Sequence, residues 1–211
     1  MHIPKFAEAN HPLIKSLFHH SDRELLTLFQ NHPEEGKYFL TIFCRYSPIV
    51  HTLIWHSARS AVQADYLFAL TWRHIFYEMR GLDLRSQAAE ANSLQNWLIN
   101  MTAFCINQQQ VPPVESINYN LQAAPPPLWC FLELALETLP PATRLVVLMT
   151  ENFHWSETRI CAYMQAEGEK ISPSEVHAIL EEGYQLLEDA LPEDIKRIYL
   201  MSVNSELATT V

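Results

Sequence analysis

The sequence predicts an all-α protein with two helical domains joined by a proline-rich linker. Thirteen prolines against four glycines, with few alternating β-branched runs, favour short helices bounded by prolines over strands. A hydrophobic content of 48% in 211 residues is enough to build buried cores. Residues 111–127 hold two proline clusters and one charge, which predicts an extended, solvated linker. We therefore expect a first domain at residues 1–110 and a second at 128–211.

Apolar residues at helical spacing predict the helices of the first domain. Ser21 with Glu24 three residues later forms a capping box, so a helix begins there and continues through Phe29. Three longer apolar runs follow, the first of which Pro48 is expected to kink or split. These runs are residues 38–54, 64–79 and 94–105, the last with Ser93 as its cap.

The sequence of the second domain predicts one helix that ends at Pro140, a second helix that begins directly after Pro141, and then a helix-turn-helix. Ser156 caps the first helix of that pair. Gly168 lies in the turn, where it can adopt a positive φ angle. Ser172 caps the longer second helix, which should reach about residue 191.

The negative charge is concentrated in the second domain. Residues 1–110 contain nine basic and nine acidic residues, whereas residues 128–211 contain five basic and fourteen acidic residues, a net of −9. Proteins that bind nucleic acid usually carry a basic surface, because neutralising phosphates supplies much of their affinity. The half of the chain with the DNA-binding pattern should therefore repel phosphate.

The sequence contains no pattern typical of an enzyme, a metal site or a membrane protein. The four cysteines are far apart and form no C-x-x-C pair, which indicates buried thiols in a reducing compartment. Among ten histidines, only His74 with Glu78 and Glu151 with His154 pair at helical spacing, without a third ligand. No phosphate loop, nucleophile elbow, leader or membrane span is visible. We expect a cytoplasmic, non-enzymatic protein with no cofactor and no metal.

The order of the motifs resembles the sigma-70 family of bacterial RNA polymerase factors. "DRELLTLF", "QADYLFALTWRHIF" and "SLQNWLINMTAF" are similar to region 2 of small members of that family. "LELALETLPPATRLVVLMTENFHWSETRICAYM" is similar to region 4 of the extracytoplasmic-function group. The resemblance covers residues 21–107 and 128–191. It implies a factor that docks on core polymerase and opens the −10 promoter element through region 2, and reads the −35 element with region 4.

The resemblance also implies which residues of region 2 make these contacts. For polymerase docking, the matching helix offers Asp65, Trp72, Arg73 and Glu78. For the −10 element, the matching loop and helix offer Arg80, Arg85, Asn96, Asn100 and Asn107. Residues 86–111 contain no Lys or Arg, so phosphate contacts along this helix would depend on neutral amides and be weak.

For the −35 element, the implied contacts come from the helix-turn-helix. They are Arg159, Ser172, Ser174, Glu175 and His177. Arg159 and the two residues after it replace the family's usual E-I-A, and the turn is several residues longer than in the family. Glu181 and Glu182 add negative charge to the second helix of the helix-turn-helix, which would contact the bases. The second domain should therefore bind promoter DNA weakly unless polymerase holds it in place.

Two functions follow from these features. The first is a sigma-like transcription initiation factor that binds core RNA polymerase and directs it to promoters. The alternative is a sigma-derived interaction protein that binds polymerase, or a sigma or anti-sigma partner, with little DNA affinity. A third option is a helical signalling adaptor that binds no DNA. The missing cations favour the alternative, and the completeness of the motif order favours the first.

Overall fold

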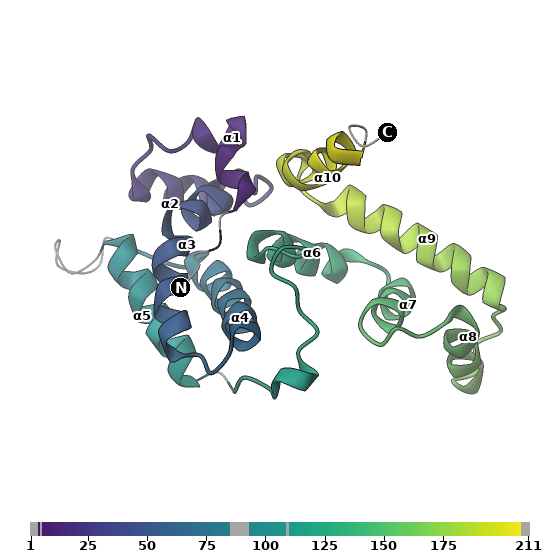
Figure 1. Cartoon of the computed structure of the whole chain (residues 1–211). Helices are drawn as coiled ribbons and strands as arrows, with labels where there is room; N and C mark the ends of the chain where they lie inside the picture. The colour runs from purple at the N-terminus through teal and green to yellow at the C-terminus, as the bar shows by residue number, and fades with distance from the viewer. Residues whose placement is uncertain (1–3, 5, 85–92, 109, 208–211) are drawn as a thin grey trace. The chain divides into compact units, whose positions relative to one another are not determined.

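The computed structural model describes residues 4, 6–84, 93–108 and 110–207, and within these ranges it contains helices and no strand (Figure 1). The all-α prediction is confirmed for this part of the chain. None of the helices described is both long and apolar enough to cross a membrane. The elements are η1 (Ala7–Asn10), α1 (Pro12–Lys15), α2 (Asp22–Asn31), α3 (Lys37–Ser57), α4 (Ala61–Met79), α5 (Leu94–Gln108), η2 (Val114–Ser116), α6 (Pro126–Thr138), α7 (Pro141–Glu151), α8 (Glu157–Ala166), α9 (Pro173–Ala190) and α10 (Glu193–Leu207).

Serine caps begin four of the helices at the predicted positions, and at α5 the Ser93 hydroxyl accepts from the Asn96 N–H at 3.2 Å. Ser21 forms a full capping box with Glu24, and the Glu24 carboxylate accepts from the Ser21 N–H at 2.7 Å. Ser156 accepts from a backbone N–H in the first turn of α8, and Ser172 forms a second capping box at α9. Pro48 lies inside α3 but does not end it, because that helix runs on to Ser57.

Contacts divide the chain into two units whose boundaries differ from the expected ones. Unit 1 comprises residues 1–130 and 192–211, and unit 2 comprises residues 131–191. The proline-rich segment 111–127 belongs to unit 1, where its Leu121 is buried and the Pro112 carbonyl accepts a hydrogen bond from Gln63 of α4. The expected solvated linker is therefore not confirmed: Leu121 is buried on unit 1, whereas residues such as Val114 and Glu115 are exposed.

The core of unit 1 is a set of buried aromatic rings on α3 and α4. The ring of Phe43 meets Trp72 edge to face at 4.9 Å, and Phe39 meets Phe76 in the same way at 4.8 Å. All four side chains are fully buried. Edge-to-face pairs of this kind add stability beyond the apolar area they bury, so they fix α4 against α3.

Helix α10 belongs to unit 1 because its first turn caps α3. The Asp194 carboxylate accepts from the backbone N–H groups of Gly36 at 3.1 Å and of Lys37 at 2.7 Å. Gly36 is the N-cap of α3 and has no side chain to satisfy these donors itself. Ile195 and Ile198 of α10 are buried as well. An anionic cap at a helix N-terminus is stabilising, and this cap explains why α10 belongs to unit 1.

Unit 2 contains most of α6 together with α7, α8 and α9, and it has its own apolar core. Val146 and Val147 of α7, Ile160 of α8, and Val176 and Leu180 of α9 are all buried in one cluster. Gly183 of α9 lies so close to α7 that an added Cβ would be 2.7 Å from Cγ2 of Val147. The absence of a side chain at this position allows α9 to approach α7.

We predict that Asp194→Ala lowers the free energy of unfolding by about 1–2 kcal/mol, because two N–H groups at the start of α3 lose their acceptor. Urea unfolding followed by tryptophan fluorescence measures the change. Glu193→Ala is the matched control, since this neighbouring carboxylate is 79% exposed and pairs only with Lys196 among the contacts described. Equal effects of the two substitutions would show that Asp194 does not cap α3.

Candidate functional site

The four residues expected to dock on polymerase all lie on α4, but they do not share one surface. Trp72 is fully buried against Phe39 and Phe43, so the expectation that it contacts polymerase is wrong. It supports the surface of α4 from inside. Arg73 is half-buried and its guanidinium lies 5.8 Å from the ring centre of Tyr77. Asp65 and Glu78 reach solvent. The sequence could not separate Trp72 from the others because an aromatic residue suits both a core and an interface.

Asp65 lies in a partly closed site between α3 and α4. Its side chain is 38% exposed, and burial raises the pKa of its carboxyl group. The Nε2 atom of the fully buried His51 lies 4.0 Å from its Oδ1 atom. A carboxylate that is partly desolvated in this way gains from a cation supplied by a partner.

The chain leaves α4 at Arg80, the first residue expected at the −10 element. Arg80 is exposed, and its guanidinium lies 4.7 Å from the ring centre of Phe76. The amide of Gln30 on α2 donates to the carbonyls of Met79 at 2.9 Å and of Leu82 at 2.8 Å, which fixes the end of α4. Sequence reasoning missed Gln30, because a single glutamine 49 residues away carries no local signal. Arg85 lies outside the described residues.

The three asparagines expected at the −10 element lie on one exposed face of α5. Asn96, Asn100 and Asn107 recur at helical spacing and all reach solvent, as expected for a contact face. Phe104 is 47% exposed beside them and stacks on His74 of α4 at 5.5 Å. This face offers amides and an aromatic ring but no cation, so it can contact bases more readily than phosphates.

The polar groups at the start of α9 are bonded mainly to one another. The Ser172 hydroxyl donates to the Glu175 carboxylate at 2.6 Å and lies 3.1 Å from the Ser174 hydroxyl. The Ser172 N–H donates to the same carboxylate at 2.7 Å, and this bonding lowers the pKa of Glu175. Ser174 and Glu175 are exposed. The structure thus brings three of the expected −35 residues together as a helix cap.

His177 links the two helices of the helix-turn-helix. Its Nδ1 atom lies 2.7 Å from Oε1 of Glu157 on α8, and its Nε2 atom lies 3.3 Å from Oε1 of Glu181 on α9. Hydrogen bonding to Glu157 and the charges of both carboxylates raise the pKa of His177. When it is protonated, the His177 ring is therefore paired with two carboxylates of the protein. The sequence reasoning missed Glu157, which is twenty residues away.

Arg159 lies in the first turn of α8 among aromatic side chains. Its guanidinium is 4.1 Å from the ring centre of Trp155, which lies 5.8 Å from Phe153 and 5.9 Å from Tyr163. Phe153 is 62% exposed. Arg159 is one of three Lys or Arg residues in unit 2, against eleven acidic residues, a net of −8. Arg159 is thus the one expected −35 residue with a permanent positive charge.

A cluster of three acidic and imidazole groups lies near the start of α3. Ligand atoms of His32, Glu34 and Glu35 lie within 4.8 Å of one another. Lys37 forms an ion pair with Glu35, and its hydrogen bond lowers the pKa of that carboxyl group. The lysine ammonium already occupies part of the space that a cation would need. The expectation that the protein needs no metal stays a prediction.

Comparisons with protein-family models, curated proteins and solved structures gave no match. The candidate surfaces on α4, α5 and α9 are therefore supported by their own geometry and by the order of motifs along the chain.

We predict that His177 titrates above the ordinary pKa of a histidine, and that Glu157→Gln moves its pKa back down. The raised value means that the α8–α9 link is stabilising below the unfolded pKa of about 6.5 and is lost as pH rises through the folded pKa. NMR titration of the His177 ring protons in the full chain measures both values. Glu188→Gln on the same helix is the control, and an equal shift with both substitutions would rule out the specific pair.

Proposed function

We propose that this chain is a sigma-like transcription initiation factor that binds core RNA polymerase and directs promoter recognition in the cytoplasm. Unit 1 supplies the polymerase-docking surface through α4 and the −10 contacts through Arg80 and α5. Unit 2 supplies the −35 contacts through the start of α9. A regulatory or anti-sigma protein is a further candidate partner of such a factor.

The α8–α9 pair is the observation that carries the proposal. The two helices pack on α7 within unit 2, and a helix-turn-helix supported by a further helix is typical of DNA readers of this kind. The second helix begins with exposed Ser174, Glu175 and His177, the end that enters the major groove in proteins of this architecture. Serine, glutamate and histidine side chains can all hydrogen-bond to base edges.

The charge of unit 2 favours a second candidate function, a polymerase-binding interaction factor with little DNA affinity. His177 is flanked by Glu157 and Glu181 and so cannot neutralise a phosphate without losing these partners. Each phosphate that a protein neutralises releases counterions and adds affinity, and unit 2 has few cations to do this. Both functions share polymerase binding and differ in promoter preference.

Capture of core RNA polymerase by the full-length chain, followed by transcription from a promoter library, tests both functions. We expect the chain to retain polymerase and to direct transcription from a limited set of promoters. Polymerase capture without promoter preference would support the interaction factor instead. Failure to capture polymerase would reject both.

Charge reversal on α4 tests the docking surface. We expect Asp65→Lys and Glu78→Lys to weaken polymerase capture roughly tenfold, because opposed charges at an interface repel. Glu34→Lys is the control, since this glutamate is exposed and lies outside α4. Thermal unfolding of Glu78→Lys should stay close to that of the wild type, because an exposed charge contributes little to stability. Thermal unfolding of Asp65→Lys shows whether the partly buried site beside His51 tolerates the change. Unchanged capture by both α4 variants would place the polymerase contact elsewhere.

The acidity of α9 generates a separate prediction for DNA binding. Replacing Glu181 and Glu182 by Lys should raise nonspecific affinity for duplex DNA and steepen its salt dependence by up to about 1.8 in the slope of log K against log salt. The same charge change at Glu133 and Glu137 of α6 is the control. Titrations of the full chain at two ionic strengths measure the slope. An unchanged slope for the α9 variant would show that this helix does not face DNA.

A further inference from the structure

The segment of residues 111–125, here called the strap, lies against the first half of α4. The Pro112 carbonyl accepts a hydrogen bond from the Gln63 side chain at 3.2 Å. The Tyr119 ring meets the Tyr66 ring at 6.1 Å in an edge-to-face arrangement. Burial raises the pKa of Tyr119, and the nearby Asp65 carboxylate raises it further. The strap therefore packs beside Asp65, on the surface of α4 that carries the candidate docking residue.

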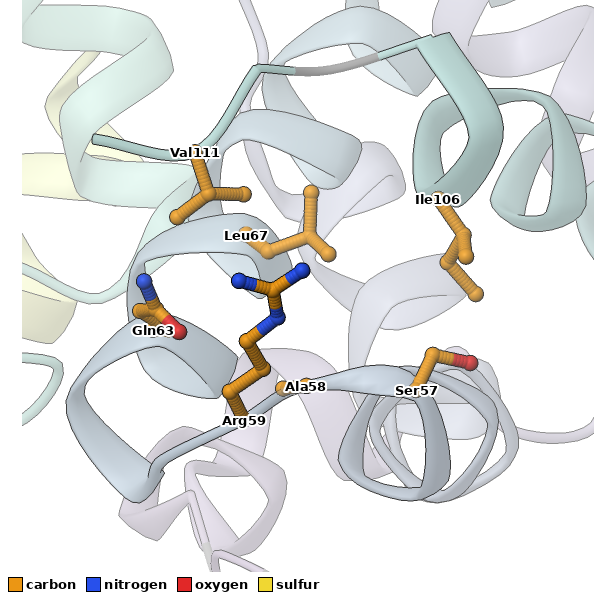
Figure 2. Close-up of a pocket in the computed structure, with 7 residues that line it drawn as sticks. All are labelled: Ser57, Ala58, Arg59, Gln63, Leu67, Ile106 and Val111. Carbon is orange, nitrogen blue, oxygen red and sulfur yellow. The ribbon is translucent and has the colours of Figure 1, made fainter. Parts of the chain in front are cut away.

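The strap is not closely packed on the helices beneath it. A pocket of about 280 Å³ lies where the strap begins (Figure 2). It is lined by Val111 of the strap, Gln63 and Leu67 of α4, Ile106 of α5, and Arg59 from the turn between α3 and α4. The pocket is partly open to solvent, so the side chains that line it make fewer protein contacts there than side chains in a closed core. Val111, at the start of the strap, is consequently less closely packed than a core residue.

The strap is also a poor electrostatic partner for α4. Residues 111–125 contain no Lys, Arg or His, so the strap brings no cation to the partly buried Asp65 carboxylate. Backbone N–H groups of the strap bond within it, as in the pairs Ser116 N–H to Pro113 O and Ala124 N–H to Asn120 O, and the Pro112 carbonyl accepts from Gln63 of α4. Prolines at 112, 113 and 125 have no N–H to donate. A partner with a basic side chain would therefore pair with Asp65 better than the strap does.

We propose that the strap is an internal cover of the polymerase-docking surface on α4, and that core polymerase displaces it by offering a basic side chain to Asp65. This inference rests on the proposed function, whose docking site it shares. In the free protein the covered state predominates. The measured affinity for polymerase is then the intrinsic affinity multiplied by the small fraction of molecules in which the strap is open. Opening the strap by mutation should tighten binding without adding any new contact.

The experiment compares equilibrium binding of core RNA polymerase by full-length variants of the strap. Tyr119→Ala removes the ring that packs on Tyr66, and we expect binding about 2- to 10-fold tighter than wild type, the range set by loss of an aromatic pair. Tyr119→Phe keeps the ring and loses only the hydroxyl, which donates to the Ala124 carbonyl at 2.7 Å. We expect this control to bind close to the wild type.

A locked strap provides the opposite test. In the double variant Tyr66→Cys with Tyr119→Cys, a short reducible thiol crosslinker joins the strap to α4. Three native cysteines are buried and burial raises the pKa of the fourth, Cys44, to about 12, so the introduced thiols react first. We expect polymerase affinity to fall on the order of tenfold or more after crosslinking and to recover after reduction.

These outcomes separate the inference from the function on which it rests. The proposal that the strap covers the docking surface is overturned if wild type and Tyr119→Ala bind polymerase with equal affinity, or if the crosslinked protein binds fully. Either result leaves the proposed function standing. No binding of polymerase by wild type, Tyr119→Ala or the reduced double variant would overturn both.

Discussion

The packing of α4 against α3 is the constraint on which the rest of unit 1 depends. Trp72 and its aromatic neighbours bury one side of α4, which leaves Asp65 and Glu78 to reach solvent. The same helix carries the strap at its first half and Arg80 at its end. Because a close-packed aromatic core permits few alternative arrangements, the candidate docking and promoter groups share one rigid support. A change in the core should therefore disturb both surfaces together.

Charge is the second constraint, and it acts on unit 2. With eleven acidic and three basic residues, this unit cannot gain much affinity from phosphates. The polar residues of α9 that are proposed to contact bases are also bonded within the protein, Ser172 to Glu175 and His177 to two glutamates. In the proposed function, polymerase supplies what the unit lacks, since holding it near the promoter raises its effective concentration. The acidity then limits binding to promoters in the absence of polymerase.

Local patterns allowed much of the fold to be predicted, and long-range contacts account for what was missed. The serine caps and apolar periodicities of α2, α8 and α9 predicted these helices, because both signals arise within one turn of the chain. The return of α10 to unit 1 depends on Asp194 meeting α3 across 157 residues, and no local pattern encodes such a contact. The packing of Tyr119 on α4 was not predicted, because proline content reports backbone stiffness and carries no information on where a side chain packs. For the site, the family resemblance implied Ser172 and His177 as promoter contacts, which stay a prediction, and only the structure revealed Glu157 as a partner of His177.

The central claim is that this chain recognises polymerase first and DNA only through it. The most direct measurement is the equilibrium affinity of the full-length protein for core RNA polymerase, compared with its affinity for promoter duplex alone at two ionic strengths. The account predicts tight binding to polymerase, and weak binding to DNA with a shallow salt slope. Tight DNA binding with a steep salt slope in the absence of polymerase would contradict it.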